Sequence, residues 1–115
     1  MNFKQKFRER QRVRHLFNPS YPEGTIKITS GESLIHARTK LEVGYWLKEN
    51  NWDIWSEVTF FNGQRADLVA IHSNGMAFCF EILVSEKERD LLNKKYPISI
   101  IPIIAKDFNY LEFKL

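Results

Sequence analysis

Three runs of aromatic and β-branched residues follow one another between residues 54 and 84, and tight-turn sequences separate them. The runs are Ile54–Phe61, Ala66–His72 and Met76–Val84. Asn62-Gly63 lies between the first two runs, and Ser73-Asn74-Gly75 lies between the second and the third. Because such short turns reverse the direction of the chain, the sequence predicts three antiparallel strands joined by hairpins. An all-helical DNA-binding bundle is thereby excluded.

Helical patterns stand on both sides of these strands. Residues 33–50 predict a helix with Ser33 as a candidate N-cap, because apolar side chains recur there at helical spacing. These apolar positions are Leu34, Ala37, Leu41 and Tyr45. Residues 85–95 predict a second, charged helix, and Ser85 is its candidate N-cap.

The end of the chain completes the expected sheet. Ile98–Ile104 is an apolar run typical of a central strand, although Pro102 within it cannot donate a ladder hydrogen bond. A strand reached through a helical crossover lies parallel to the strand before it. The predicted fold class is therefore α/β, with a mixed sheet of three antiparallel strands plus one parallel strand, flanked by helices. Residues 25–29 alternate and predict a short edge strand, and residues 107–115 have no clear assignment.

The chain has 115 residues, which corresponds to one domain. We divide it into a basic N-terminal arm, residues 1–24, and a domain, residues 25–115. Residues 1–17 contain six Lys or Arg and one Glu, whereas the rest of the chain has a net charge of −2. The basic residues of the arm, Lys4, Lys6, Arg8, Arg10, Arg12 and Arg14, indicate a helix (residues 3–17) that contacts a polyanion such as DNA. The alternative is a helix whose charges only keep the protein in solution.

Several classes of protein are not expected from the composition. The one cysteine, Cys79, excludes a disulfide framework and a multi-cysteine zinc site. The longest uncharged apolar stretch, residues 97–105, is far shorter than the roughly 20 residues that span a bilayer. The charged N-terminus does not resemble a secretory signal, so we expect a cytoplasmic protein with no membrane partner and no small-molecule cofactor.

Carboxylates in unexpected places are the candidate functional groups. Glu81 lies within an apolar strand, where a carboxylate is costly unless it is paired or bound to a cation. Asp67 lies on the neighbouring strand, so the two acids can converge on one hard cation such as Mg²⁺. Glu42, on the preceding helix, is a third candidate ligand. Alternatively, Glu81 pairs with a buried basic residue, Asp67 belongs to a turn and Glu42 lies on the helix surface.

The order of these elements resembles the PD-(D/E)XK nuclease superfamily and its Holliday-junction-resolvase branch. Arg65-Ala66-Asp67-Leu68-Val69 is similar to the metal-binding Asp strand, and residues 80–85 are similar to the E-x-K strand. Residues 32–40, Glu-Ser-Leu-Ile-His-Ala-Arg-Thr-Lys, resemble a motif of the competence-protein (CoiA-like) branch. The resemblance covers residues 32–104.

The resemblance implies a restriction-endonuclease-like core and a metal-dependent DNA endonuclease, either structure-selective or nonspecific. Asp67, Glu81 and Glu42 would hold Mg²⁺ or Mn²⁺, and His36 or Lys40 would assist as a proton shuttle or an electrostatic clamp. The expected partners are DNA and, by analogy, a second copy of the chain. DNA contacts are expected from the arm and from Arg65 and Lys87.

One position departs from the family pattern. Leu83 stands where the superfamily has lysine and the competence branch has glutamine. A lysine there would orient the attacking water and stabilise charge at phosphorus, and leucine does neither. Arg65, Lys40 and Lys87 are candidate substitutes. The alternative is a catalytically inactive nuclease-fold protein that binds DNA or a nuclease partner.

Overall fold

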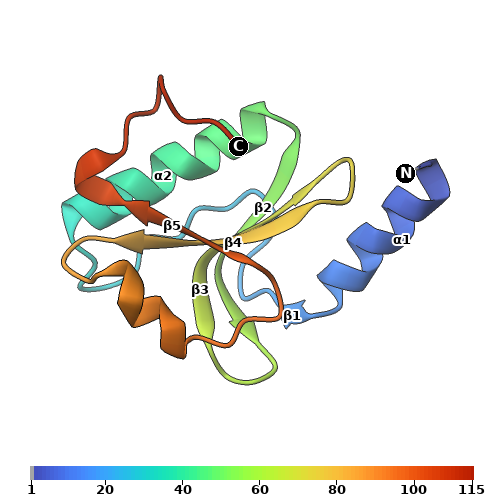
Figure 1. Ribbon diagram of the computed structural model, residues 1–115, viewed down its shortest axis with the longest axis horizontal. Coiled ribbons are helices and arrows are strands. Elements are labelled where there is room, and N and C mark those ends of the chain that lie inside the picture. Colours follow the sequence, from blue (N-terminus) through green and yellow to red (C-terminus); the bar gives the residue numbers. More distant parts are fainter. Residues whose placement is uncertain (1) are drawn as a thin grey trace.

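The computed structural model describes residues 2–115, which form one five-stranded sheet and the helices packed on it. The strands lie side by side in the order β1-β2-β3-β4-β5 (Figure 1). The elements in chain order are α1 (Phe3–Arg14), β1 (Phe17–Asn18), α2 (Leu34–Glu49), β2 (Trp52–Phe60), β3 (Arg65–His72), β4 (Ala77–Leu83), the 3₁₀ helix η1 (Glu88–Asn93), β5 (Ile100–Ile104) and the 3₁₀ helix η2 (Ala105–Asp107).

The directions of the strands confirm the predicted mixed sheet. β2, β3 and β4 are antiparallel neighbours, and β5 pairs with β4 in parallel. Gly63 and Gly75 occupy the two turns with φ of +86° and +98°. Residues other than glycine rarely adopt this backbone conformation. The glycines that predicted the two turns are therefore required there by sterics, and the structure confirms both turns.

The two edges of the sheet differ from the prediction. β5 is an edge strand rather than a central one. An edge strand has one side without a ladder partner, which is why Pro102 is tolerated there. The other edge is β1, and residues 25–29 form no strand. Two of their backbone groups pair instead with the Ser56 hydroxyl, which accepts from the Lys27 amide (2.9 Å) and donates to the Thr25 carbonyl (2.7 Å).

The crossover between β4 and β5 is not the regular helix that the sequence predicts for residues 85–95. Within that stretch only the short η1 is helical. Residues 84–93 are all exposed except Leu91, which is half-buried. The physical reason lies in two adjacent leucines. Leu91 and Leu92 point in different directions and cannot make an apolar stripe, and the side chain of Leu92 remains 82% exposed.

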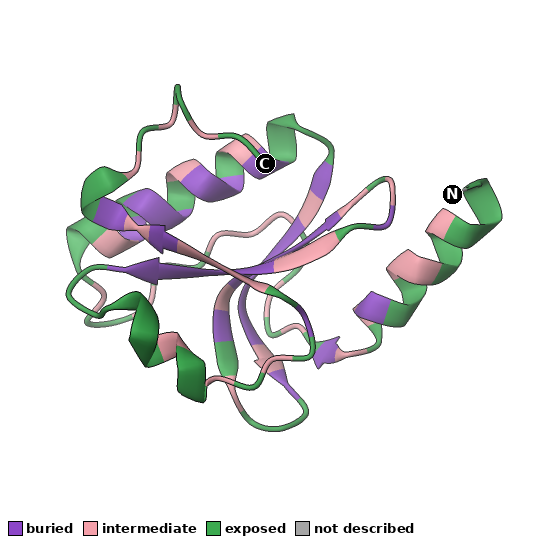
Figure 2. Cartoon of the chain, viewed as in Figure 1, coloured by how far each residue is buried: buried purple, intermediate pink, exposed green. Residues whose placement is uncertain are grey.

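Apolar side chains form two buried clusters, one on each face of the sheet. The strands are accordingly coloured mostly as buried in Figure 2. α2 covers one face and packs Val43 and Leu47 against β2, β3 and β4. Of the predicted apolar positions of α2, Ala37 is buried, but Leu34, Leu41 and Tyr45 are 83%, 52% and 55% exposed. The side that faces the sheet consists of Ala37, Thr39, Lys40, Val43, Gly44 and Leu47. A charged lysine thus occupies a core position, which periodicity of apolar residues cannot anticipate.

α1 projects from the body of the molecule and contacts it at one end (Figure 1). Phe3 and Phe7 are exposed, and Val13 is the residue of α1 that is buried. Arg10 donates to the carbonyl oxygens of Ile71 (3.3 Å) and His72 (2.9 Å) at the end of β3. Its guanidinium therefore acts as a structural clamp that holds the arm on the sheet.

Candidate functional site

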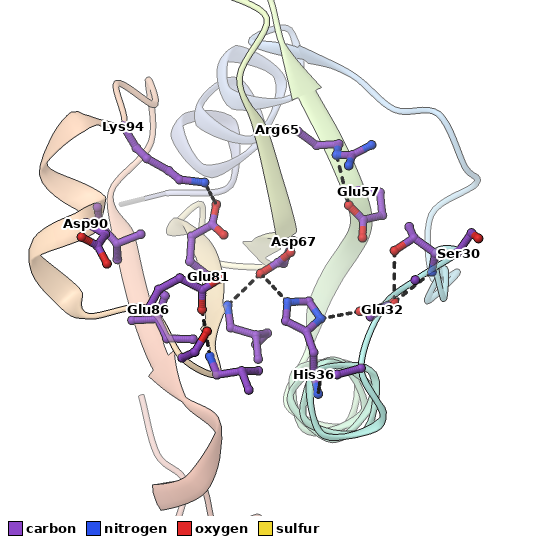
Figure 3. A pocket seen from close by; sticks show the side chains of 18 residues that line it. Ser30, Glu32, His36, Glu57, Arg65, Asp67, Glu81, Glu86, Asp90 and Lys94 are labelled. Atoms are coloured by element: carbon purple, nitrogen blue, oxygen red, sulfur yellow. Dashed lines mark hydrogen bonds and ion pairs between the residues drawn. The ribbon is translucent and has the colours of Figure 1, made fainter.

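A pocket of about 620 Å³ opens to the surface where the N-terminus of α2 approaches the sheet and the crossover segment (Figure 3). Its walls come from the loop before α2, from the first turn of α2, from three neighbouring strands and from η1. The polar residues that line it are Thr29, Ser30, Glu32, Ser33, His36, Glu57, Arg65, Asp67, Glu81, Ser85, Glu86, Asp90 and Lys94. This composition makes the pocket strongly charged, with carboxylates in the majority.

A row of three carboxylates crosses the sheet at the pocket. The ladder pairs Ser56 with Leu68 and Leu68 with Phe80. The next position along each strand places Glu57, Asp67 and Glu81 at the same level of β2, β3 and β4. Like charges at opposed positions of a sheet repel one another, so this row needs basic partners or bound cations.

Glu57 has a backbone conformation that turns its own carboxylate toward the pocket. Its φ is +52°, a left-handed value that costs energy in a residue with a side chain. On β2 the usual alternation is broken there, because Ile54 packs on the α2 face while Val58 packs on the opposite face. On β3 the alternation of side chains between the two faces is also broken at Asp67, the residue opposite Glu57, because Ala66 and Leu68 pack on different faces. Without this change, both carboxylates would point away from α2.

The first two turns of α2, together with Glu32 just before its N-cap, supply a buried network of charges. His36 and Lys40 lie four residues apart and therefore on one side of the helix, and Glu32 contacts both of them from the residue before the N-cap. Glu32 pairs with His36 Nδ1 and with Lys40 Nζ (2.7 Å), and it accepts from the Thr29 amide (2.9 Å). Burial opposes its charge, but the hydrogen bonds from Lys40, Thr29 and His36 outweigh burial and lower the pKa of Glu32 to about 2.

Lys40 joins this network to the carboxylate row. Its side chain has no exposed surface, and Nζ lies 3.0 Å from Glu57 Oε1 as well as 2.7 Å from Glu32. Arg65 reaches the other Glu57 oxygen from the rim of the pocket (3.4 Å) and is 62% exposed. Basic and acidic groups thus alternate from Arg65 through Glu57, Lys40, Glu32 and His36 to Asp67.

Asp67 is held from two sides. His36 Nε2 lies 3.3 Å from Asp67 Oδ2, and the backbone amide of Ile82 donates to the same oxygen (2.8 Å). Burial raises the pKa of the Asp67 carboxyl, but the hydrogen bonds from His36 and Ile82 lower it below its ordinary value. The amide of Ile82 follows Glu81 directly in the chain, so the Asp67 carboxylate lies against the Glu81–Ile82 peptide (Figure 3).

Glu81 has a different electrostatic environment. Its side chain is 7% exposed, its Oε1 contacts the Tyr96 hydroxyl, and Lys94 Nζ lies 3.6 Å from that oxygen. Burial, followed by the charge of Asp67, raises the pKa of Glu81 to about 7. The alternation of charge therefore stops between Asp67 and Glu81, where two carboxylates adjoin and no basic side chain lies between them.

The protonation of His36 predicts how stability depends on pH. The hydrogen bond to Asp67 raises its pKa from 6.5 to about 9, against the effect of burial. The folded protein then retains a proton that the unfolded chain releases, so this group stabilises the fold fully below pH 6.5 and the contribution is lost as pH rises through 9. The raised pKa of Glu81 acts in the same direction between pH 4.5 and 7.

Urea unfolding of metal-free protein measures this effect. The free energy of unfolding is expected to be larger at pH 6.5 than at pH 9, and His36→Gln is expected to reduce the difference. If the free energy of unfolding falls equally between pH 6.5 and pH 9 in the wild type and in His36→Gln, groups other than His36 cause the pH dependence.

The structure brings together some of the predicted site residues and separates others. Asp67, Glu81, His36 and Arg65 line the pocket. Lys40 lies beneath it as a buried partner of two carboxylates rather than as a group that reaches substrate. Lys87 precedes η1 on the exposed side of the crossover and is not part of the lining.

Glu42 does not reach the pocket, contrary to its predicted role as a ligand. It pairs with Arg38 one turn earlier on the outer side of α2 (3.2 Å). Six residues separate Glu42 from His36, which is about one and two-thirds turns of helix, so the two side chains leave α2 in different directions. The position of Glu42 agrees with the alternative given in the sequence analysis, that it lies on the surface of the helix.

The basic arm also lies apart from the pocket. Arg10 contacts the end of β3 at Ile71 and His72, whereas Asp67 lies near its beginning. Four residues of strand correspond to about 13 Å. Three of the arm's cations have partners within the protein. Arg10 pairs with Asp53, Arg12 pairs with Glu9, and Arg14 lies over the rings of Phe17 and Trp55.

Sequence reasoning missed four residues of the site, namely Glu32, Glu57, Tyr96 and Lys94. Glu57 gives the same signal as Glu81, a carboxylate in an otherwise apolar strand, and could have been found by it. Glu32 stands in the motif before α2, and the resemblance assigns no role to it. Nothing in the sequence places Tyr96 or Lys94 at the pocket, because an irregular crossover determines their positions.

A hard divalent cation fits the donors that the pocket offers. Among residues 2–115, no three His, Cys, Asp or Glu side chains are grouped so that they could hold a metal ion by themselves. Asp67 and Glu81 supply carboxylate oxygens in a pocket with room for water. Mg²⁺ is commonly bound by one or two carboxylates and keeps several waters, so this donor set suits it.

Comparison with models of protein families, with curated proteins and with solved structures finds no significant match to this chain. Within residues 2–115, neither helix combines the length and the apolar character needed to cross a bilayer.

Proposed function

We propose that the protein is a metal-dependent DNA endonuclease whose active site is the pocket around Asp67 and Glu81. The observation that supports it most is the junction of these two carboxylates at the end of a charge network that otherwise alternates in sign. Two adjoining buried acids are unfavourable by themselves, and a shared divalent cation removes the repulsion. The open pocket gives a phosphodiester access to that point.

In this proposal Asp67 and Glu81 hold one or two Mg²⁺ or Mn²⁺ ions. When bound, the metal lowers the pKa of a water molecule and offsets negative charge on the phosphate. His36 is a positioning residue, because its ring is held between Glu32 at Nδ1 and Asp67 at Nε2. Glu32 holds His36 in place, and Lys40 in turn pairs with Glu32 beneath the pocket. With a pKa of about 9, His36 is a cation near neutral pH and is better suited to orient Asp67 than to shuttle protons.

The arrangement of strands also supports the proposal. The strand that contains Asp67 and the strand that contains Glu81 are antiparallel neighbours, preceded by a helix and followed by a parallel strand. This is the order that the resemblance to PD-(D/E)XK nucleases implies. A restriction-endonuclease-like core is therefore part of the proposal.

The second candidate is a binding protein of the same fold that lacks catalysis. The observation in its favour is Leu83, which lines the pocket two residues after Glu81 and is almost fully buried. A leucine cannot donate a hydrogen bond to phosphate or water. Under this alternative the protein binds DNA, or docks on a nuclease, without cutting the backbone.

Incubation of the purified protein with supercoiled plasmid separates the two candidates. We expect nicked or linear product with Mg²⁺ or Mn²⁺ and none with a chelator. Linear product formed directly, without a nicked intermediate, would indicate two cooperating copies, as expected by analogy for a small nuclease that cuts both strands. Shifted but uncut DNA in every metal would instead support the binding protein.

The salt dependence of DNA binding tests the role of the arm. Arg10, Arg12 and Arg14 have partners within the protein, so phosphate contacts from α1 are expected mainly from Lys4, Lys6 and Arg8. The logarithm of the DNA-binding constant falls linearly with the logarithm of the salt concentration, and replacing these three residues with glutamine should make that slope shallower by about two to three. Replacing Lys106 and Lys114 with glutamine is the control. An unchanged slope in the α1 variant would remove the arm from the interface.

A further inference from the structure

We infer that Lys94, from the crossover segment, supplies the positive charge that Leu83 cannot supply at the scissile phosphate. The inference deepens the proposed function and rests on it. Three basic side chains line the pocket. His36 is held between two carboxylates and Arg65 lies at the rim on Glu57, whereas Lys94 Nζ lies 3.6 Å from Glu81 Oε1 (Figure 3).

The hairpin between β2 and β3 fixes the position of Lys94 from both sides. The Asn62 side-chain amide donates to the Lys95 carbonyl (2.6 Å). Gln64 accepts from the Lys95 amide (2.6 Å) and lies 3.5 Å from the Asn93 carbonyl oxygen. These contacts bracket Lys94 in the chain. The same hairpin begins β3 and hence places Asp67, so one structural unit positions both the acid and the ammonium.

A second contact directs the side chain of Lys94 into the pocket. Its Nζ lies 3.2 Å from the Tyr96 hydroxyl oxygen, and that hydroxyl also contacts the Arg65 carbonyl oxygen (2.6 Å) and Glu81. The Lys94 side chain is 36% exposed, so the ammonium meets both the buried acid and the water of the pocket. A phosphate bound near Asp67 and Glu81 would therefore come within reach of it.

The chemical role assigned to Lys94 is electrostatic. In hydrolysis, the oxygen of a water molecule forms a bond to phosphorus while the bond to the leaving oxygen breaks. The attacking water loses a proton to solvent, and the leaving oxygen gains one from water. Lys94 remains an ammonium throughout and donates a hydrogen bond to a non-bridging phosphate oxygen, where negative charge increases in the transition state.

Three variants of the full chain test this role against a purely structural one. Lys94→Met is expected to reduce the cleavage rate about a hundredfold, the usual effect of removing one donor to a developing oxyanion. Its affinity for Mn²⁺, measured by calorimetry, should be unchanged or higher, because a cation beside Glu81 competes with the metal. Lys94→Arg should retain part of the activity. Arg89→Met removes an exposed cation from the same segment and is the matched control.

A double-mutant cycle tests the hairpin contacts. Gln64→Ala is expected to slow cleavage by about tenfold, because the segment around Lys94 loses its anchor. Combined with Lys94→Met, it should cause little further loss, since both changes remove the same interaction. Additive losses would show that Gln64 acts independently of Lys94.

The outcomes distinguish this inference from the proposed function. A wild-type protein that neither cleaves DNA nor binds Mn²⁺ overturns the proposed function, and the inference with it. An active wild-type protein and an equally active Lys94→Met overturn the inference alone. A loss of cleavage that follows from an equal loss of Mn²⁺ affinity also overturns it, because Lys94 would then only support the metal ligands.

Discussion

Replacing Asp67 with asparagine is expected to abolish metal-dependent DNA cleavage, with a loss of at least about a thousandfold. Asparagine has nearly the same shape, and its side-chain oxygen can still accept from the Ile82 amide. It lacks the negative charge that binds a divalent cation and that pairs with His36. The substitution therefore removes the metal ligand while it leaves the hydrogen bond between β3 and β4 in place.

Plasmid cleavage with Mg²⁺ and calorimetric titration with Mn²⁺ measure this loss. DNA binding should remain close to that of the wild type, because Asp67 is not a cation that contacts phosphate. Glu49→Gln is the matched control, since Glu49 is an exposed carboxylate at the far end of α2. If the Asp67→Asn protein cleaves at the wild-type rate, Asp67 has no part in the mechanism.

Lys40→Met is expected to cause the largest loss of stability, about 3–5 kcal/mol in the free energy of unfolding. Lys40 is fully buried and neutralises two carboxylates, Glu32 and Glu57, whose side chains are 3% and 8% exposed. Methionine fills the space of the aliphatic chain but leaves two buried negative charges near each other. Removing one member of a buried charge cluster costs far more than losing a surface ion pair.

Urea unfolding followed by tryptophan fluorescence measures the change, with Lys48→Met as the control for an exposed lysine of the same helix. Changing Glu32 and Glu57 to glutamine together with Lys40→Met should recover part of the loss, because the buried charges then disappear together. If Lys40→Met lowers the free energy of unfolding by less than about 1 kcal/mol, water reaches the carboxylates of Glu32 and Glu57.

The network around Lys40 shows how the fold accommodates a row of acids at the pocket. The positive φ of Glu57 and the buried charges both cost free energy, and such costs are concentrated at functional sites. Tertiary contacts offset them, since each carboxylate of the row has a basic neighbour from another element. Glu57 has Lys40 and Arg65, Asp67 has His36, and Glu81 has Lys94.

Much of this site could be predicted from local sequence signals. The Asn62-Gly63 turn predicts the hairpin that leads into β3, and an acid within an apolar strand identifies Glu81. Other predictions failed where a distant contact determines the outcome. The apolar residues of α2 predict one buried side, yet the side that packs on the sheet is the one that contains Lys40. Lys40 can be buried there because Glu57 and Glu32 neutralise its charge.

The sequence by itself determined β2, β3, β4 and β5, the turns between the first three, and the mixed directions of these strands, because steric preferences of the backbone and alternation of side chains act over a few residues. Only the tertiary structure decided which side chains meet at the pocket. The left-handed backbone of Glu57 reverses the alternation of β2 and turns its carboxylate toward α2, and an irregular crossover brings Lys94 beside Glu81. Both features depend on contacts between residues far apart in the chain, which no local pattern encodes.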